Sequence, residues 1–412
     1  MKILILQDDF PPVSFGGAGI ATFNFTKELK KNGHNIVILT TTQYKGKDQV
    51  IEYDGLKIHK IYSKFHERWR AYLSLYNPQT IKKARKIIAE FKPDVIYVNN
   101  IHHYLSYHCL KIAKQSGAKV FLTAHDVMIF HYGKLTEFIN PKDLSCPKKF
   151  NYKISPWQQI KKYKWRYNPF RNIVIKHYLK YVDKIFAVSG ALKEALNQNG
   201  IKNVEVLHNG INLDDWITED SEVKKFKEKY YLNDKKIVLF GGRLSEAKGG
   251  YQAISTMAEV IKKIPDAVLL IMGEKNSYAE KMLDFSKNLK IESHLIFTGW
   301  ITGDELKSAY YASSIVIVPS IYCEPFGLIC LEAMLCRKPI VATCFGGPPD
   351  IVLSDKSGYI INPYDIPQMA LSIIVLLSDI IKATEFGKAG YNRAVNDFNL
   401  TQQVNKFLTK II

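Results

Sequence analysis

The sequence predicts an α/β protein built from two doubly wound parallel-sheet domains, and three observations lead to this prediction. The chain of 412 residues is longer than one hydrophobic core usually organises. Short runs rich in Val, Ile and Leu alternate with helical patterns, which is typical of parallel sheets covered by helices on both faces. This alternation occurs in both halves of the chain, and the polar, charged segment 212–234 between them is the best linker candidate.

The first half begins with an apolar strand at 2–6, followed by a helix at 20–31 that ends at Gly33. Further strands of this half are expected at 36–40, 95–98, 120–124 and 184–188. Strands of the second half are expected at 236–240, 268–272, 295–298, 315–318, 340–342 and 359–361. We therefore assign residues 1–212 to an N-terminal domain and 213–389 to a C-terminal domain, with a helix at 390–412 that packs back on the first.

Both domains are expected to bind ligands at one edge of their sheets. In open parallel sheets, ligands bind outside the C-terminal ends of the strands. Two such domains side by side would place both edges around a single cleft, so the motifs that carry chemistry should fall there.

The composition is ordinary for a soluble globular protein, but the charge is strongly basic and uneven. Hydrophobic residues make up 47% of the chain and charged residues 23%, while the net charge is +18. Residues 131–180 contain twelve Lys and Arg against two acids, a net charge of +10. The aromatic residues of this stretch include Trp157, Tyr163, Trp165, Tyr167, Phe170 and Tyr178. The region 131–181 is therefore a candidate for contact with an anionic membrane surface, although nucleic acid or plain solvent would also suit this composition.

We expect a cytoplasmic protein, with peripheral attachment to the inner membrane face left open. The six cysteines show no C-x-x-C spacing and are expected to be reduced, mostly buried thiols. The start, MKILILQDDF, has no small-residue cleavage site and is expected to be a strand. The most apolar windows are shorter than the roughly 20 residues that a membrane-spanning helix needs.

The first candidate motif is FGGAGI at 15–20, between the first strand and the first helix. Glycines at this position let a ligand approach the backbone, and the helix N-terminus attracts anions. A structural turn and a phosphate site both remain open. The motif is not G-x-G-x-x-G, which argues against a nicotinamide cofactor.

The second motif is FGGRLSEAKGG at 240–250, after the first strand of the second domain. Arg243 and Lys248 lie five positions apart beside paired glycines. An arginine fork and a lysine point charge in such a loop can bind a diphosphate. Two exposed loop cations are the alternative.

The third motif is EPFGLICLEAMLC at 324–336, an apolar segment that contains two glutamates. Its helix is expected to begin near Gly327 or Leu328, so that free N–H groups face the ligand edge of the sheet. Glu324 then lies in the loop before the helix, and Glu332 lies one to two turns inside it. Carboxylates are natural acceptors for adjacent sugar hydroxyls.

Together these motifs resemble family 4 glycosyltransferases, the group 1 glycosyl transferases, which are retaining enzymes of the GT-B fold. Glu324 and Glu332 match the E-x7-E signature, Gly16 with Gly17 the N-terminal glycine pair, and Arg243 with Lys248 the R-x4-K motif. Further matches are His125-Asp126 in LTAHD, Ser189 in AVSG, Asn209-Gly210 in LHNGI, Gly273 in IMGE and Gly299 in FTGW. The resemblance spans nearly the whole chain.

The resemblance implies transfer of a sugar from a UDP- or GDP-linked donor to a glycan or lipid-linked saccharide, with retention of configuration. The N-terminal domain would bind the acceptor and the C-terminal domain the nucleotide sugar, without a metal or another cofactor. The implied catalytic residues are His125, Arg243, Lys248 and Glu324. The implied donor-binding residues are Gly16, Gly17, Asn209, Gly242, Arg243, Lys248, Gly273, Glu324, Phe326, Gly327, Leu328 and Glu332.

Glu324 would hold donor sugar hydroxyls and Glu332 the ribose, while Arg243 and Lys248 would stabilise the departing diphosphate. A protonated His125 would contribute electrostatically near the reacting sugar, and a structural histidine is its alternative. The chain departs from the family at Asp350, where glutamate is common; we expect Asp350 to cap the next helix. Other functions left open are a sugar-nucleotide epimerase or a phosphorylase of the same fold, and a non-catalytic binder of nucleotide sugars or nucleic acid.

Overall fold

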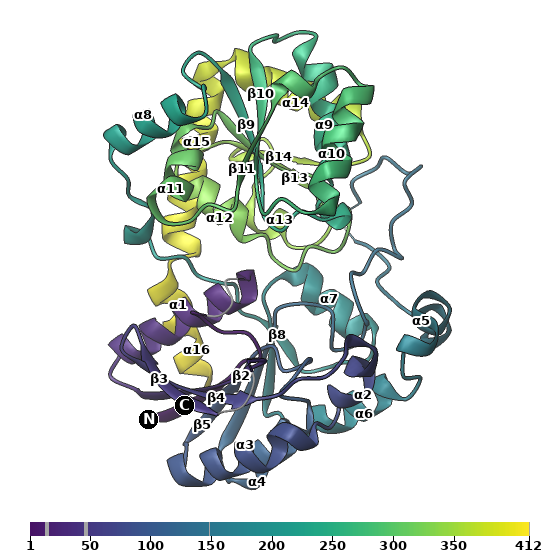
Figure 1. Cartoon of the computed structure of the whole chain (residues 1–412), viewed down its shortest axis with the longest axis vertical. Coiled ribbons are helices and arrows are strands. Elements are labelled where there is room, and N and C mark those ends of the chain that lie inside the picture. Colours follow the sequence, from purple (N-terminus) through teal and green to yellow (C-terminus); the bar gives the residue numbers. More distant parts are fainter. Residues whose placement is uncertain (13–15, 45–47, 148, 412) are drawn as a thin grey trace. The chain divides into compact units, whose positions relative to one another are not determined.

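A computed structural model describes residues 1–12, 16–44, 48–147 and 149–411, and the chain forms two compact units (Figure 1). Unit 1 comprises Met1–Leu135, Asn151–Gly210 and Leu400–Ile412, and unit 2 comprises Thr136–Phe150 and Ile211–Asn399. Each unit has its own mainly parallel sheet covered by helices, which confirms the predicted α/β class. The predicted common cleft between the units stays a prediction.

The sheet of unit 1 has the strand order β3-β4-β2-β1-β5-β6-β7-β8. Its strands are β1 (Lys2–Leu6), β2 (Asn35–Thr42), β3 (Gln49–Tyr53), β4 (Leu56–Tyr62), β5 (Val95–Val98), β6 (Lys119–Ala124), β7 (Lys184–Ala187) and β8 (Val204–Val206). All pairs are parallel except β3 with β4. The central strand β1 pairs with β2 along one edge and with β5 along the other. Its residues 3–6 are all apolar and buried, as expected for a strand covered by helices on both faces of the sheet.

Some helices of unit 1 begin at a side-chain cap. Asn77 caps the helix that starts at Pro78, and Ser155 forms a capping box with Gln158. The helices are α1 (Gly17–Lys31), α2 (Arg70–Leu73), α3 (Pro78–Phe91), α4 (His108–Gln115), α5 (Pro156–Tyr163), α6 (Arg171–Leu179), α7 (Gly190–Gln198) and α16 (Leu400–Ile411), with short 3-10 turns η1 (Glu67–Trp69) and η2 (Lys164–Arg166).

Unit 2 contains a fully parallel sheet of order β11-β10-β9-β12-β13-β14, and all six strands predicted for this half are present. The strands are β9 (Lys236–Gly241), β10 (Ala267–Met272), β11 (Leu295–Gly299), β12 (Ile315–Val318), β13 (Ile340–Thr343) and β14 (Gly358–Ile361). The helices are α8 (Asp220–Lys229), α9 (Gly250–Ile261), α10 (Ser277–Asn288), α11 (Gly303–Ala312), α12 (Leu328–Leu335), α13 (Pro348–Ile351), α14 (Ile366–Ser378) and α15 (Ile380–Asp397), with the 3-10 turns η3 (Asp214–Trp216), η4 (Glu246–Lys248) and η5 (Glu292–His294).

The predicted linker 212–234 is largely a folded part of unit 2. Helix α8 lies in it, and Phe226 is buried. Both Lys229 and Tyr230 bind the carboxylate of Glu305 on α11. The polar composition of this segment belongs to a solvent-facing helix rather than to a linker.

Two further segments depart from the predicted domain boundaries. The stretch Thr136–Phe150 belongs to unit 2, because the Asn362 side chain donates to the carbonyls of Asp143 and Ser145. The rings of Phe138 and Phe150 also contact Phe345. At the C-terminus only α16 returns to unit 1, while α15 stays with unit 2. Among the described residues, no single helix is long and apolar enough to span a membrane; α14 and α15 meet that test only as a pair bent by 101°.

Helix α16, coloured yellow in Figure 1, packs into the core of unit 1 through Leu400, Val404, Phe407 and Ile411. Phe407 is fully buried, and its ring contacts the rings of Phe25, Tyr97, Phe121 and Phe186. The last helix of the chain therefore completes the core of the first unit.

Replacing Phe407 with alanine should destabilise unit 1 by about 3–5 kcal/mol, because it leaves a cavity among four aromatic rings. Phe407→Leu, which conserves most of the volume, should cost less than about 1.5 kcal/mol. Urea and thermal unfolding of the full chain measure both changes. Equal unfolding midpoints for the alanine variant and the natural chain would contradict this packing.

Candidate functional site

In unit 2, three neighbouring strands of the sheet end next to the predicted motifs. Gly242 and Arg243 follow β9, Gly273 follows β10, and the loop that contains Glu324 follows β12. Because parallel strands share one C-terminal edge, these segments lie at the same edge of the sheet. The structure therefore brings the second and third motifs together within one unit.

The centre of this edge is the carboxylate of Glu324, whose exposed fraction is 6%. Its Oε2 lies 2.7 Å from Nζ of Lys248 and accepts a hydrogen bond from Ser320 Oγ at 2.8 Å. Its Oε1 accepts a hydrogen bond of 2.8 Å from the Tyr322 hydroxyl. One cation and two neutral hydroxyls thus engage both oxygens of a buried carboxylate, as burial of a charge requires.

The backbone of Glu324 is fixed by the turn after β13. Its N–H donates to the carbonyl of Phe345, and its own carbonyl accepts from the N–H of Gly347. Gly346 has φ +92°, and a Cβ there would collide with the carbonyl oxygen of Glu324. Only glycine fits this close approach, so the GG of GGPPD positions the glutamate.

Helix α12 begins one residue after Gly327, as predicted, and Leu328 is its first residue. The side chain of Phe326 is buried beside this start. The apolar face of α12 is also buried, through Cys330, Leu331, Ala333, Met334 and Leu335. The first N–H groups and the positive end of the helix dipole follow directly after the Glu324 loop.

Glu332 lies on the second turn of α12 and is half-buried. It accepts a hydrogen bond from the Tyr310 hydroxyl through Oε2. Burial raises the pKa of Glu332, and the hydrogen bond from Tyr310 and the charge of Lys248 oppose this shift. Its predicted contact with a ribose stays a prediction.

The two cations of the second motif, Lys248 and Arg243, differ in their partners and in their exposure to solvent. Lys248 is engaged by Glu324, and its side chain is 21% exposed. Arg243 is exposed and forms no ion pair within the described ranges. One of the three N–H donors of Lys248 is thus engaged by Glu324, and the predicted shared binding of a diphosphate by Arg243 and Lys248 stays a prediction.

In unit 1, His125 follows β6 and is buried against Asn99, which follows the neighbouring β5. Its Nε2 lies 2.9 Å from Oδ1 of Asn99. Burial lowers the pKa of His125 to about 4, although the charge of Asp126 opposes the shift. Desolvation of its site therefore favours the neutral form of His125 in the unliganded chain, and the contribution of a protonated His125 near the reacting sugar stays a prediction.

The remaining predicted residues of unit 1 lie in loops or at a helix start. Gly16 precedes α1, Gly17 is the first residue of α1, and Asn209 lies half-buried after β8. A Cβ at Gly16 would meet nothing within 4 Å, and its φ is −67°, so neither packing nor conformation requires glycine there. Open space at a helix start leaves room for a ligand. Phe15 of this motif lies outside the described residues.

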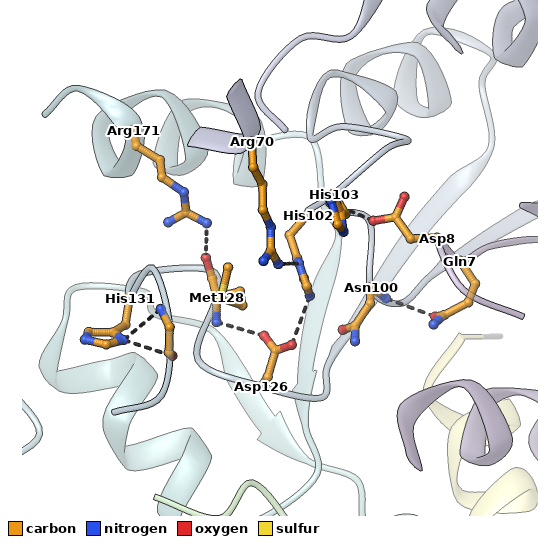
Figure 2. Close-up of polar contacts among 11 residues, drawn as sticks. Gln7, Asp8, Arg70, Asn100, His102, His103, Asp126, Met128, His131 and Arg171 are labelled. Atoms are coloured by element: carbon orange, nitrogen blue, oxygen red, sulfur yellow. Dashed lines mark hydrogen bonds and ion pairs between the residues drawn. The ribbon is translucent and has the colours of Figure 1, made fainter. Parts of the chain in front are cut away.

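The sequence did not predict a polar network at the same edge of unit 1 (Figure 2). The carboxylate of Asp8 accepts hydrogen bonds from the N–H groups of His103, Tyr104 and Leu105. Burial raises the pKa of Asp8 to about 6, and the neighbouring His102 and these donors oppose the shift. The strand-end position of the His102-His103 pair, after 95–98, was the signal that could have revealed this network.

Two further predictions concern the position of Asp350 and the absence of a metal ion from the reaction. Asp350 lies in the first turn of the short helix α13, where its N–H donates to the Gly347 carbonyl. Metal independence stays a prediction: across the part of the chain that the structure describes, no group of three or more His, Cys, Asp and Glu side chains is placed to hold a metal ion.

Comparison with known proteins connects this geometry to a family. The model named Glycosyltransferase Family 4 matches residues 15–215, and the model named Glycosyl transferases group 1 matches residues 222–393. An uncharacterized glycosyltransferase of Methanocaldococcus jannaschii is 25% identical over 391 residues, covering 92% of this chain and 90% of that protein. A GDP-mannose-dependent alpha-(1-6)-phosphatidylinositol monomannoside mannosyltransferase of Mycolicibacterium smegmatis is 27% identical over 201 residues, 47% of this chain and 52% of that protein.

Among solved structures, the Anabaena protein HepE in complex with UDP and glucose superposes with a TM-score of 0.73 at 18% identity. The match covers 100% of this chain and 99% of that protein, which shows a shared GT-B fold. The first family model ends at residue 215 and the second begins at residue 222, so together they span nearly the whole sequence. This chain therefore belongs to glycosyltransferase family 4, the group 1 glycosyl transferases.

Proposed function

We propose that the protein transfers a sugar from a nucleotide-diphosphate sugar to a glycan or lipid-linked saccharide, with retention of configuration and without a metal. The observation that carries the proposal is the Lys248–Glu324 pair beside the exposed Arg243 at the sheet edge of unit 2. A buried carboxylate and two cations at a helix start match both ends of such a donor, the sugar hydroxyls and the diphosphate.

In the proposed reaction, Lys248 exchanges Glu324 for the diphosphate, and Arg243 adds its planar fork to the same group. Lysine suits this exchange because its ammonium is a point charge on a flexible stem. Glu324 keeps the hydroxyls of Ser320 and Tyr322, and the oxygen released by Lys248 accepts from a donor sugar hydroxyl. The two cations then stabilise the negative charge of the departing diphosphate, which is the larger part of the catalysis.

The neighbouring groups position the rest of the donor. Glu332 would accept the ribose hydroxyls in place of the Tyr310 hydrogen bond. The N–H groups of Gly327 and Leu328 would meet the sugar or a phosphate at the start of α12. His125, neutral in the unliganded state, would act as a hydrogen-bonding group rather than as a cation.

The donor candidates are UDP- and GDP-sugars. HepE was crystallised with UDP and glucose, and the M. smegmatis relative is named as GDP-mannose-dependent. The acceptor named for that relative is a phosphatidylinositol monomannoside, which supports a lipid-linked acceptor for this chain.

We also propose that the protein attaches peripherally to an anionic membrane surface, at the cytoplasmic face, through the basic and aromatic region 131–181, mainly through its part in unit 1, residues 151–181. Trp157 on α5 and Trp165 on η2 are 71% and 69% exposed, and Phe170 and Ile173 are similarly exposed. Exposed basic residues between Trp157 and Lys180 are Lys161, Lys162, Lys164, Arg166, Lys176 and Lys180. Exposed indole rings beside cations suit the headgroup layer of a bilayer. Tyr167 is not part of this surface, because it is buried against Met128 and Tyr132.

Nucleotide sugars should stabilise the full chain in EDTA, because binding to the folded state alone raises its stability. At a hundredfold excess over the dissociation constant, the gain is about 2.7 kcal/mol. Thermal-shift measurements with UDP-, GDP- and ADP-sugars identify the nucleotide. If none of these ligands shifts the melting temperature, the proposed function is wrong; an isomerised donor released without transfer would support the epimerase alternative.

Lys248→Ala should lower kcat/KM for transfer by about 10²–10³-fold, since it removes one of two cations from the leaving diphosphate. Lys235→Ala is the matched control, because Lys235 is an exposed lysine next to the opposite, N-terminal end of β9. Steady-state kinetics with the identified donor measure both variants, and unfolding without ligand separates loss of fold from loss of chemistry. Equal kcat/KM for Lys248→Ala and the natural chain would contradict the role of the lysine.

The double variant Trp157→Ala/Trp165→Ala should lose most binding to vesicles that contain anionic lipid at low salt, because the rings and cations act together. Trp300→Ala is the control, since Trp300 is 55% exposed but lies in unit 2, outside the region 131–181. Sedimentation with anionic and neutral vesicles measures the difference. A natural chain that ignores anionic vesicles would refute the membrane proposal.

A further inference from the structure

Two arginines of unit 1 extend from different helices to neighbouring loops, Arg70 to His102 after β5 and Arg171 to Met128 after β6 (Figure 2). Arg70 is the first residue of α2, and Arg171 is the first residue of α6. Nη2 of Arg70 lies 3.0 Å from Nδ1 of His102, and Nη2 of Arg171 donates to the carbonyl of Met128. Arg171 is fully buried, while Arg70 is half-buried.

Neither guanidinium forms an ion pair with an aspartate or glutamate within the described ranges. Asp126 bonds His102, and Glu67 pairs with His103 instead. The Nε atoms of both Arg70 and Arg171 are buried without a hydrogen-bond partner among the described residues. Two arginines with unused donors and no directly bonded carboxylate are unusual, because buried cations are normally paired directly.

The two positive charges also act on each other. Burial lowers the pKa of Arg171, and the charge of Arg70 adds to that shift, whereas the hydroxyls of Tyr107 and Tyr167 oppose it. The Arg171 guanidinium lies 5.6 Å from the centre of the Tyr132 ring. Arg171 therefore lies near a second cation and beside an aromatic ring. The carboxylate that acts on Arg70 is that of Asp126: burial raises the pKa of Asp126, but His102 and Arg70 help to lower it below its usual range.

His102 holds Arg70 in a fixed direction. An arginine can only donate, so Nδ1 of His102 must accept, and its Nε2–H donates to Oδ2 of Asp126 at 2.9 Å. Asp126 also accepts from the N–H of Met128 at 2.8 Å. The chain Arg70–His102–Asp126 thus orients the guanidinium before any ligand arrives.

We propose that Arg70 binds a phosphate group carried by the acceptor substrate, with Arg171 behind it adding positive potential. The planar fork of arginine matches the oxygens of a phosphate. Arg70 is partly accessible and has unused donors, so it makes the contact; Arg171 has no exposed surface and holds the Met128 loop. The phosphate is either that of a sugar phosphate or that of a lipid headgroup.

The assignment to the acceptor rests on the proposed function. The donor-binding groups Arg243, Lys248 and Glu324 belong to unit 2, whereas the arginine pair belongs to unit 1. Asp126, which anchors the chain to Arg70, directly follows His125 at the end of β6. A phosphate held here would tether the acceptor at the same sheet edge as His125.

Inorganic phosphate is the first probe, titrated calorimetrically into the full chain against chloride at equal ionic strength. Arg70→Gln should weaken phosphate binding at least about tenfold, because it removes a charged hydrogen-bond donor. Arg68→Gln is the matched control, since Arg68 is an exposed arginine two positions earlier, over the Trp69 ring. Phosphate binding that is weakened in Arg70→Gln but persists in the double variant Arg243→Gln/Lys248→Ala excludes the donor site as its source, because both cations of that site are then absent.

Arg70→Lys keeps the charge without the fork and should fall between the natural chain and Arg70→Gln, which guards against a variant that simply unfolds. Equal phosphate binding by Arg70→Gln and the natural chain, or no binding by any variant, would overturn the inference. Glycerol 3-phosphate and vesicles that contain phosphatidylinositol then distinguish the two sources of phosphate. Nucleotide-induced thermal shifts, unchanged in Arg70→Gln, report the proposed function separately.

Discussion

The ion pair between Lys248 and Glu324 is the interaction on which the site in unit 2 depends. A carboxylate as buried as that of Glu324 is stable only with partners, and removing one partner of a buried pair costs about 3–5 kcal/mol when no other donor replaces it. Ser320 and Tyr322 supply two other donors, so the lysine can leave at a lower cost. The ion pair thus holds the Lys248 ammonium close to the position where the proposed diphosphate would bind.

The rest of the site follows from keeping this carboxylate in place. The glycine turn at 346–347 fixes the Glu324 backbone, and the buried apolar face of α12 fixes the helix start that follows it. In unit 1, burial favours the neutral form of His125 at the sheet edge, and Arg70 is oriented through His102 and Asp126.

The sequence predicts the central strands well because each is a continuous apolar run buried on both faces, as in β1 and β9. It misses β3 and β4, a hairpin at one sheet edge whose first strand is mostly exposed, and β8 at the other edge, which has only three residues. It also assigns 136–150 to the wrong unit, since the hydrogen bonds of Asn362 to that segment span more than two hundred positions. The local sequence pattern predicts helices and strands, but it does not predict which distant segments of the chain they contact.

The same limit holds for the site. The motifs correctly place Arg243, Lys248, Glu324 and Glu332 near one sheet edge, but the contact between Lys248 and Glu324 joins residues 76 positions apart. The charge state of His125 depends on desolvation, which only packing decides.

The most direct test of the account is a crystal structure of the full chain with a bound nucleoside diphosphate. If Lys248 exchanges Glu324 for the diphosphate, Lys248 Nζ moves from 2.7 Å to beyond ion-pair distance of Glu324 Oε2 and contacts a phosphate oxygen, while Ser320 and Tyr322 keep their hydrogen bonds. A diphosphate bound elsewhere, or bound with the Lys248–Glu324 pair intact, would contradict the account.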